Sequence, residues 1–185
     1  MCLIINTLVL RMTKLIYLSL GSNLGNREQH LEKALSLIQS RLGALESVSR
    51  VYESEPWGYT SSKHFCNCCV SLRTSLAPPE LMQQLLKIEG EMGRQRDGKG
   101  YSDRIIDIDL LLYGDSQINH PGLTVPHPSM AGRRFVLAPL AEIAADLIHP
   151  VSGKSILNML EECADQSELN PLPYKFFSRS SSQNM

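Results

Sequence analysis

Two carboxylates separated by one residue are the strongest chemical signal in the sequence. Asp107 and Asp109 lie in the apolar run IIDIDLLLY, whose composition is typical of a β-strand. Residues two apart on a strand point to one face, so both carboxylates should lie side by side, with Cα atoms about 6.6 Å apart. Like charges on an apolar strand repel each other unless a cation joins them, and hard carboxylate oxygens suit magnesium. The pair therefore predicts a site for one or two Mg²⁺ ions.

The alternative is a sheet edge that carries two solvated acids. The apolar residues that alternate with the acids favour the metal site, because they should point the other way, towards covering helices. These residues are Ile106, Ile108, Leu110 and Leu112.

Arginines lie near this run on both sides in the sequence. Arg94, Arg96 and Arg104 precede it, and Arg133 and Arg134 follow in a later loop. Phosphoryl transfer needs positioning and cations on the phosphate oxygens, which the guanidinium fork supplies. Alternatively, Arg94 and Arg96 could be cations that stabilise the C-terminus of a helix. Arg104 could instead form an ion pair with a carboxylate. Acids and arginines together favour phosphate chemistry.

Neither of two glycine-containing loops is a known phosphate-binding motif. The segment GRQRDGKG has glycine after its lysine and lies between a helix and a strand, the reverse of a P-loop. The segment LGSNLGN lacks both that lysine and the dinucleotide-binding glycine pattern. Phosphate must therefore be bound by side chains and metal.

Several residues could bind a flat heterocycle. Asn67 lies within an apolar strand, where a buried amide either recognises a ring edge or satisfies a neighbouring loop. His127, between two prolines, contacts phosphate or caps the short helix that follows. Aromatic residues could stack on a ring, although each could equally belong to the core. These aromatic residues are Trp57, Phe65, Tyr101 and Phe135.

The elements that must position these residues follow from hydrophobic periodicity. Strands are expected at about 15–20, 45–54, 65–74 and 105–113, and helices at 27–42, 78–92 and 156–163. This order predicts an α+β fold, a ferredoxin-like βαββαβ sandwich with an antiparallel sheet and helices on one face. The other face should be free for a site, and the residues after Gly114 should decorate this core.

Composition limits the class of protein. The chain has 185 residues with 18 basic and 19 acidic side chains, so general attraction to nucleic acid or membrane is not expected. Cys66, Cys68 and Cys69 lack a second Cys/His pair for zinc and indicate buried thiols in a reducing cytoplasm. We expect a cytoplasmic monomer that binds small molecules.

The apolar start, MCLIINTLVL, has its positive charges after the apolar run and is too short to span a bilayer. We expect residues 1–13 to be a non-essential extension, 14–177 a single catalytic domain and 178–185 a flexible tail.

The chain resembles the hydroxymethyldihydropterin pyrophosphokinases of folate biosynthesis over about residues 15–150. Four segments carry the likeness, and the third is the most specific: IYLSLGSNLGNRE, FCNCCV, RIIDIDLLLYG and LTVPHPSM with RRFVLAPLAEIA. The resemblance implies a ferredoxin-like fold and transfer of pyrophosphate from ATP to the pterin hydroxymethyl group. The hydroxymethyl oxygen would attack the β-phosphorus in line, with AMP leaving, while loops around 55–64 and 95–103 close.

The resemblance also implies roles for individual residues. Asp107 and Asp109 would bind two Mg²⁺ ions, and Arg94 and Arg104 would assist transfer. The implied ATP-site residues are Glu89, Arg96, Leu110, Thr124, His127 and Arg133. The implied pterin-site residues are Ser54, Glu55, Trp57, Gly58, Phe65, Asn67, Tyr101 and Phe135.

Three departures from the family pattern affect the loops. Tyr101-Ser102-Asp103 stands where the family often has Trp-Gly-Pro, which places an extra acid near the phosphates. Pro128 replaces a frequent tyrosine, and Trp57 replaces a smaller apolar residue.

Two other classes of protein are compatible with the same element order. A regulatory domain would bind a metabolite without consuming ATP and would not need paired aspartates. An RRM-type domain would need aromatics in an RNP pattern on a basic sheet, where this sequence has aspartates.

Overall fold

The computed structural model describes residues 13–94, 101–174 and 176. Most of the expected N-terminal extension, the whole expected tail and Arg96 lie outside this range, and so does most of the expected 95–103 loop. In the described part, no helix is long and apolar enough to cross a bilayer.

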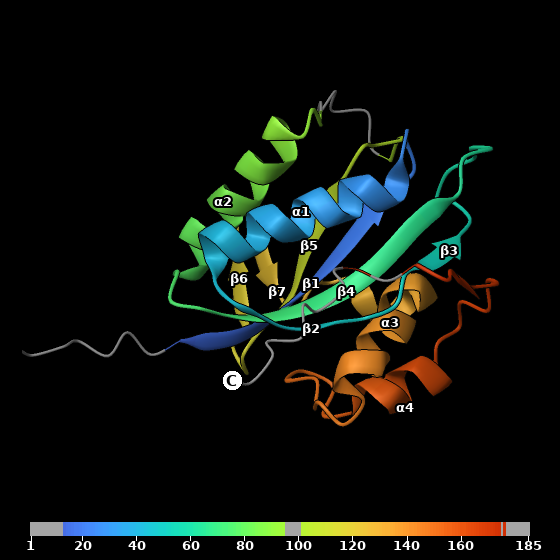
Figure 1. The fold of residues 1–185 in the computed structure, drawn as a ribbon. Coiled ribbons are helices and arrows are strands. Elements are labelled where there is room, and N and C mark those ends of the chain that lie inside the picture. The colour runs from blue at the N-terminus through green and yellow to red at the C-terminus, as the bar shows by residue number, and fades with distance from the viewer. Residues whose placement is uncertain (1–12, 95–100, 175, 177–185) are drawn as a thin grey trace, which may run out of the picture.

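Within the described residues, eight strands and four α-helices follow one another in the order that the periodicity predicted, with additions (Figure 1). The strands are β1 (Lys14–Ser22), β2 (Leu45–Val48), β3 (Tyr52–Ser54), β4 (Phe65–Thr74), β5 (Asp107–Tyr113), β6 (Ile118–His120), β7 (Leu123–Val125) and β8 (Asn170–Pro171). The helices are α1 (Arg27–Leu42), α2 (Pro78–Glu91), the 3₁₀ turn η1 (Met130–Gly132), α3 (Arg134–Ala144) and α4 (Ile156–Glu161).

The main sheet is antiparallel and runs β5-β1-β4-β3-β8, with β2 also paired to β4. This strand order confirms the ferredoxin-like sandwich. The expected strand at 45–54 is divided into β2 and β3. Strands β6 and β7 form a separate two-stranded ladder.

Helices α1 and α2 cover one face of the sheet because each has an apolar stripe. In α1, Asn26 caps the first turn by accepting a hydrogen bond from Gln29 N, and Leu31, Leu35 and Ile38 are buried. Alternate residues of the central strands, such as Leu18, pack against these helices in one apolar core. Burying a leucine-sized side chain contributes about 1.5–3 kcal/mol, so this core stabilises the framework on which the site is built.

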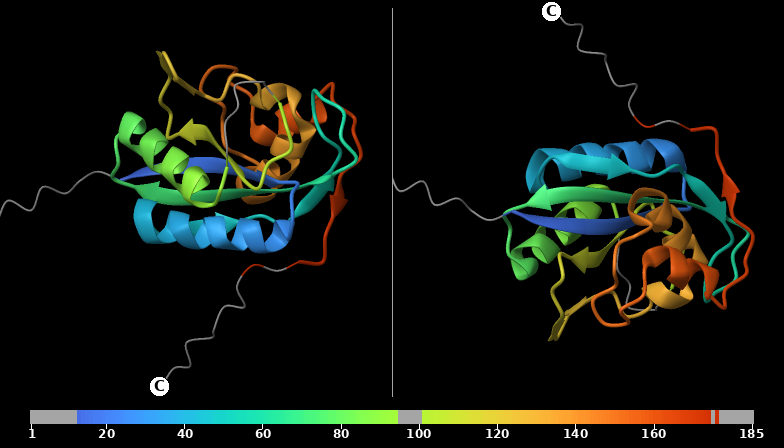
Figure 2. Two further views of the ribbon diagram at one scale, coloured as in Figure 1. Left: turned by 90° about the horizontal axis from the view of Figure 1, so that it is seen from above. Right: turned by 90° about the horizontal axis from the view of Figure 1, so that it is seen from below.

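The opposite face is only partly free, which corrects the expectation of helices on one face. Helices α3 and α4 lie across the sheet from α1 (Figure 2) and pack on Tyr17, Cys69 and Leu111. Apolar segments after Gly114 thus form a second core, and α3 is longer than the short helical region expected there. The uncovered part of this face carries the polar residues described below.

A β-bulge corrects one orientation on β5. Tyr17 pairs with Leu112 but Leu18 pairs with Leu110, so Leu111 is an extra residue. The alternation of faces therefore shifts at this point. Leu112 packs against α3 and α4, and not with Ile108 and Leu110 as expected. The two aspartates precede the bulge and keep the predicted orientation.

Candidate active site

Three neighbouring strands supply the polar residues on the uncovered part of the second face. Gly21 of β1 pairs with Asn67 of β4 on one side and with Asp107 of β5 on the other. Ser19, two residues earlier, pairs with Asp109. The small residues of β1 leave space between the amide on one strand and the carboxylates on the next. The antiparallel register thus creates a cleft between Asn67 and the two acids.

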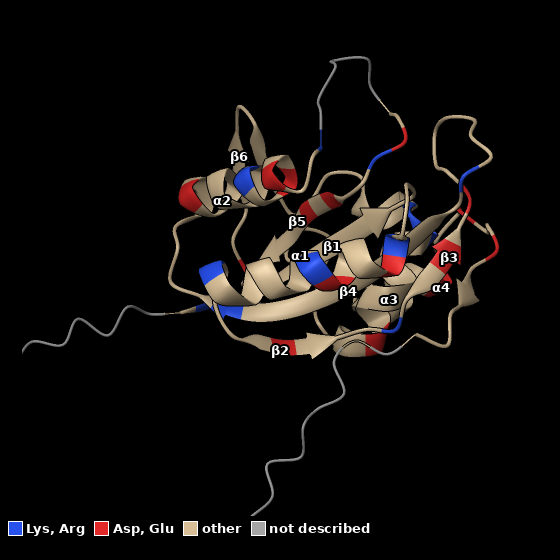
Figure 3. Ribbon diagram, turned by 45° about the horizontal axis from the view of Figure 1, so that its top comes forward, with Lys and Arg blue, Asp and Glu red and all other residues tan. Residues whose placement is uncertain are grey.

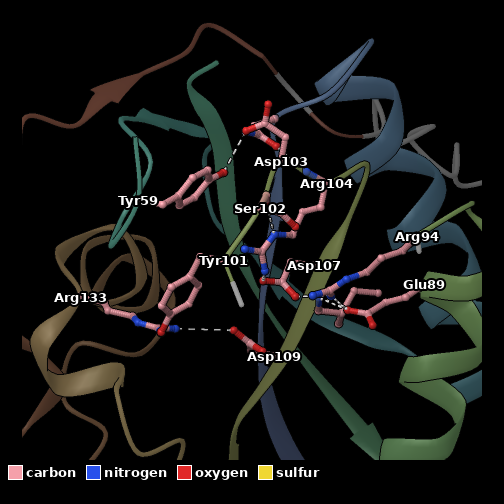
Figure 4. A network of polar contacts seen from close by, with 12 residues as sticks. Tyr59, Glu89, Arg94, Tyr101, Ser102, Asp103, Arg104, Asp107, Asp109 and Arg133 are labelled. Carbon is pink, nitrogen blue, oxygen red and sulfur yellow. Dashed lines mark hydrogen bonds and ion pairs between the residues drawn. The ribbon is translucent and has the colours of Figure 1, made fainter. Parts of the chain in front are cut away.

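Asp107 is held by two arginines (Figure 4). Arg104 Nη1 donates to Asp107 Oδ2 at 2.6 Å, and Arg94 Nη1 donates to Oδ1. Arg104 Nε also donates to the carbonyl of Ser102, at 2.9 Å. Two charge-assisted hydrogen bonds on one carboxylate fix its orientation on the strand.

Glu89 joins the end of α2 to this cluster. Its carboxylate is buried, accepts a hydrogen bond from Ile108 N at 2.8 Å and forms an ion pair with Arg94. Gly93, with φ of 94°, turns the chain after α2 in a conformation that favours glycine, and so brings Arg94 back towards the helix. Glu89 therefore acts behind the cleft, where it positions an arginine and the aspartate strand together.

Asp109 lies two residues further along the same face of β5 and has more distant partners. Arg133 Nη1 and His127 Nε2 each lie 3.9 Å from Asp109 Oδ2. Burial, followed by the neighbouring charge of Asp107, raises the pKa of Asp109, although Arg133 opposes this shift. Burial and Arg133 lower the pKa of His127 to about 4, so its imidazole is neutral at pH 7.

Aromatic side chains surround the guanidinium of Arg133. Its central carbon lies 4.7 Å from the ring centroid of Trp57, and the rings of Tyr101 and Phe135 lie about it at 6.0 and 5.9 Å. Arg133 Nη2 also donates to Tyr101 Oη at 3.0 Å. Within the described residues, the buried Nε of Arg133 has no hydrogen-bond partner. We call the rings of Trp57, Tyr101 and Phe135 the aromatic wall. The guanidinium of Arg133 lies against this wall, beside Asp109.

Asn67 occupies the opposite side of the cleft. Its Nδ2 donates to Ser54 Oγ at 2.9 Å, and this bond sets the direction of the amide. Phe65, two residues earlier, lines the same space. The cleft measures about 500 Å³ including its open mouth. Its lining residues are Ser19, Gly21, Ser54, Glu55, Trp57, Tyr59, Phe65, Asn67, Tyr101, Arg104, Asp107, Asp109, Arg133 and Phe135.

A second hollow lies beside α2 and β7, on the other side of His127. It contains Leu110, Thr124 and His127, for which the family resemblance implied a place in the ATP site. Its lining residues are Met82, Leu110, Gly122, Leu123, Thr124, His127 and Pro128.

The sequence of this chain matches the model of a known protein family. Residues 17–145 match the model described as 7,8-dihydro-6-hydroxymethylpterin-pyrophosphokinase (HPPK). The chain belongs to this family. The match runs from within β1 to the end of α3 and includes every residue assigned to the site.

Curated relatives cover the same region at high identity. The chain is 45% identical over 139 residues to the 2-amino-4-hydroxy-6-hydroxymethyldihydropteridine pyrophosphokinase of Porphyromonas gingivalis, which spans 74% of this chain and 94% of the relative. It is 40% identical over 156 residues to the protein of that name from Aquifex aeolicus, covering 84% of this chain and 94% of the relative.

Solved structures share the fold. The Plasmodium falciparum HPPK-DHPS wild type superposes with a TM-score of 0.68 at 17% identity, over 81% of this chain. This chain spans 44% of that longer chain. At this identity the likeness supports the fold alone.

The fold brings most of the predicted site residues together around the first cleft. Most predicted pterin-site residues line the first cleft with Asp107, Asp109, Arg104 and Arg133. Gly58 lies beside it, because a Cβ added there would be 3.3 Å from the Tyr101 ring. Glu89 and Arg94 stand behind the cleft.

Ser19, Gly21 and Tyr59 also line the cleft, although the sequence argument did not assign them. The register could have indicated the first two, since alternate residues of β1 share the face of the aspartates. Tyr59 carried no comparable signal.

The extra acid of the family departure does not point at the arginine cluster. Asp103 Oδ1 accepts hydrogen bonds from Asn23 Nδ2 at 2.8 Å and from Tyr59 Oη at 3.1 Å. Lys63 Nζ lies 3.3 Å from its other oxygen. Figure 4 shows the Asp103 carboxylate turned towards Tyr59 and away from Asp109. The concern that this acid repels phosphate is therefore not supported by its position.

Proposed function

We propose that this chain transfers the pyrophosphoryl group of ATP to the hydroxymethyl group of 6-hydroxymethyl-7,8-dihydropterin, with release of AMP. The observation that carries this proposal is one cleft that Asn67 and aromatic rings line together with two carboxylates and two arginines. A flat polar heterocycle suits the first set, and a polyphosphate with its cation suits the second. Membership of the HPPK family and the names of its relatives support the same reaction.

The pterin fits the side of the cleft formed by β3 and β4. The Asn67 amide is held by its hydrogen bond to Ser54 Oγ. It can offer its second N–H as a donor and its carbonyl oxygen as an acceptor to the edge of a ring. Phe65 and Phe135 line the same space from different elements and can contact the faces of a ring. The hydroxymethyl group of a ring bound in this way would extend towards the aspartates.

Asp107 and Asp109 suit magnesium by the chemistry of their donors, since both supply hard oxygens to one cleft with room for water and phosphate oxygens. We infer that Asp107 and Asp109 hold two Mg²⁺ ions. Bound magnesium would supply positive charge that offsets the charge developing on the phosphates. Within the described residues, no group of three or more His, Cys, Asp or Glu side chains is placed to hold an ion. Substrate oxygens and water would therefore complete the coordination.

The arginines have a second partner when phosphates arrive. Arg94 and Arg104 now neutralise Asp107, and their guanidinium groups can exchange this carboxylate for phosphate oxygens. Arg133 lies between the aromatic wall and Asp109, where it can contact the transferred group. Such preorganised positive charge is the main protein contribution expected for phosphoryl transfer.

The second hollow is the proposed place of the nucleoside. Leu110 and Met82 are apolar contacts for a base, and Thr124 supplies a hydroxyl. His127 lines this hollow and lies 3.9 Å from Asp109, so a nucleotide there would have its phosphates near the aspartates. Neutral His127 can donate to phosphate from one ring nitrogen.

The test is to incubate the protein with ATP, magnesium and 6-hydroxymethyl-7,8-dihydropterin and to separate the products. We expect AMP and pterin diphosphate in equal amounts. Formation of ADP, or binding of pterin with no ATP consumption, would contradict the proposal. The metabolite-sensing alternative is not favoured by any feature of the described residues. A cytoplasmic location and a monomeric state remain predictions.

A further inference from the structure

The carboxylate of Asp103 joins two segments that are about 40 residues apart in the sequence. One segment is the 55–64 loop, which contributes Tyr59 and Lys63, and the other is residues 101–104. Tyr59 Oη donates to Asp103 Oδ1 at 3.1 Å, while Lys63 Nζ forms an ion pair with Oδ2 at 3.3 Å. Both oxygens of Asp103 are therefore used across the boundary between the two segments.

Asn23, at the end of β1, anchors this junction to the sheet. It is only 3% exposed, and its Nδ2 lies 2.8 Å from Asp103 Oδ1. Its Oδ1 accepts a hydrogen bond from Arg104 N at 2.7 Å, and its own N donates to Arg104 O at 3.1 Å. Asn23 Nδ2 also donates to Lys63 O at 3.2 Å. The junction thus lies one residue from Arg104, a proposed catalytic residue.

A second contact joins the same two segments at the cleft. The rings of Trp57 and Tyr101 meet edge to face with centroids 5.8 Å apart. Both rings line the cleft, and Tyr101 Oη accepts a hydrogen bond from Arg133 Nη2 at 3.0 Å. The position of this aromatic pair depends on how the two segments are held. The polar contacts around Asp103 join the same two segments outside this aromatic pair.

We infer that Asp103 is a positioning residue, which fastens the 55–64 loop to residues 101–104 and so assembles the aromatic wall before substrate binds. Preassembly lowers the cost of ordering the loops when pterin enters. A carboxylate suits this role because it accepts from several donors and carries a charge opposite to that of Lys63. The kinetic consequence rests on the proposed function, but the structural consequence does not.

The protonation states agree with this role. Burial opposes ionisation, but hydrogen bonds, led by the one from Asn23, lower the pKa of Asp103. Burial and the bond to Asp103 raise the pKa of Tyr59 to about 12, so its hydroxyl remains a donor at neutral pH. Charged acceptor and neutral donor therefore coexist throughout the physiological range.

Trp57 provides a direct readout, because it is the single tryptophan of the chain. Its side chain is about a third exposed (37%) on the 55–64 loop. We would measure acrylamide quenching of its fluorescence without substrates in wild type, Asp103→Ala, Asp103→Asn and Tyr59→Phe. Asp115→Ala is the matched control, since the Asp115 side chain is 93% exposed and outside the cleft.

We expect Asp103→Ala to increase the quenching constant by about twofold, because the loop samples more open positions. Tyr59→Phe, which removes one hydroxyl, should give a smaller increase. Asp103→Asn retains an acceptor for Asn23 and Tyr59 and should restore part of the wild-type value. Unchanged quenching in both Asp103→Ala and Tyr59→Phe, at a temperature where each is folded by circular dichroism, would overturn the inference.

The kinetic arm separates positioning from a general structural defect. For Asp103→Ala we expect the KM for pterin to rise about 5- to 20-fold, with kcat and the KM for ATP changed less than about twofold. A fall in kcat alone, with the pterin KM unchanged, would overturn the role in assembling the wall. If the wild type forms no AMP, the proposed function fails, whereas the quenching result still decides the role of Asp103.

Discussion

Asp107 and Asp109 point into one cleft with unequal partners. Two arginines donate hydrogen bonds to Asp107, whereas Arg133 Nη1 and His127 Nε2 each lie 3.9 Å from Asp109. The first carboxylate is therefore held by side chains, while the second has more room for a cation or a phosphate-bound water. This asymmetry suggests separate tests for the arginines and for Asp109.

Replacing Arg104 tests whether its charge acts on the transferred group. We expect Arg104→Ala to lower kcat by about 100- to 1000-fold, the range for loss of one preorganised transition-state donor. Arg104→Lys should recover only part of this loss, since an ammonium cannot form the two-pronged contact. Steady-state AMP formation is the measurement, with the exposed Arg73→Ala as control. A kcat within threefold of wild type would show that Arg104 only orients Asp107.

Gly21→Ala tests the shape of the pterin side of the cleft. A Cβ at this position would lie 3.1 Å from Asn67 Oδ1 and 3.5 Å from Phe65 Cδ1. The added methyl would displace the amide or fill space needed by the ring. We expect the KM for pterin to rise about tenfold while the KM for ATP stays within about twofold. Gly90→Ala is the control, since Gly90 is exposed on α2 and an added Cβ there meets no atom within 4 Å. An equal rise in both KM values for Gly21→Ala would contradict this assignment.

Glu89 should contribute to stability more than its helix position alone implies. Its removal breaks the ion pair with Arg94 and leaves Ile108 N without its buried acceptor. We expect Glu89→Ala to lower the free energy of unfolding by about 3 kcal/mol, as for other broken buried ion pairs. Urea denaturation gives this value. Glu89→Gln retains an acceptor and should lose less.

The matched control is Glu80→Ala, at the exposed start of α2, where loss of the favourable helix-dipole interaction should cost about 0.5 kcal/mol. If Glu89→Ala unfolded at the same urea concentration as Glu80→Ala, the ion-pair cluster would contribute nothing measurable.

The cysteines of β4 should be unreactive in the folded protein. Burial raises the pKa of Cys66 to about 11, and those of Cys68 and Cys69 are raised as well. These thiols therefore remain protonated in the folded state at pH 8. In a background that carries Cys2→Ser and Cys163→Ser, we expect reaction with Ellman's reagent at pH 8 to follow global unfolding. A rapid reaction of one thiol per chain under native conditions would contradict the burial of this strand.

The same shifts predict a loss of stability at alkaline pH. A thiol whose folded pKa lies above its unfolded value of about 9 stabilises the fold fully below that pH. Unfolding releases its proton more readily as the pH rises from 9 towards 11, so the free energy of unfolding should fall across this window. Urea denaturation at several pH values measures it. A constant free energy of unfolding between pH 8 and 11 would count against the shifts.

The sequence predicted the elements whose residues repeat with a clear period. The helix at 27–42 and the strand at 65–74 appear with the expected bounds because apolar spacing, an Asn cap and flanking turn residues agree. The facing of Asp107 and Asp109 followed from the two-residue period of a strand. These features depend on local sequence alone.

Features that depend on pairing between distant segments could not be predicted in this way. The bulge at Leu111 is a property of the β1–β5 register, which no residue in β5 reveals. Arg133 contacts Trp57, which lies 76 residues earlier in the sequence. The orientation of Asp103 depends on Tyr59, which belongs to the same loop as Trp57. Figure 3 shows acidic and basic segments close together at the start of β5, although the chain has a net charge of only -1.

The most direct test of the account is AMP formation by Asp109→Ala, with Asp146→Ala as a surface control. The account predicts that Asp109→Ala loses at least about 1000-fold in turnover while its circular dichroism spectrum remains that of the wild type. The surface variant should retain full turnover. Near-normal AMP formation by folded Asp109→Ala would contradict the proposal that this pair of aspartates holds the cation under the polyphosphate.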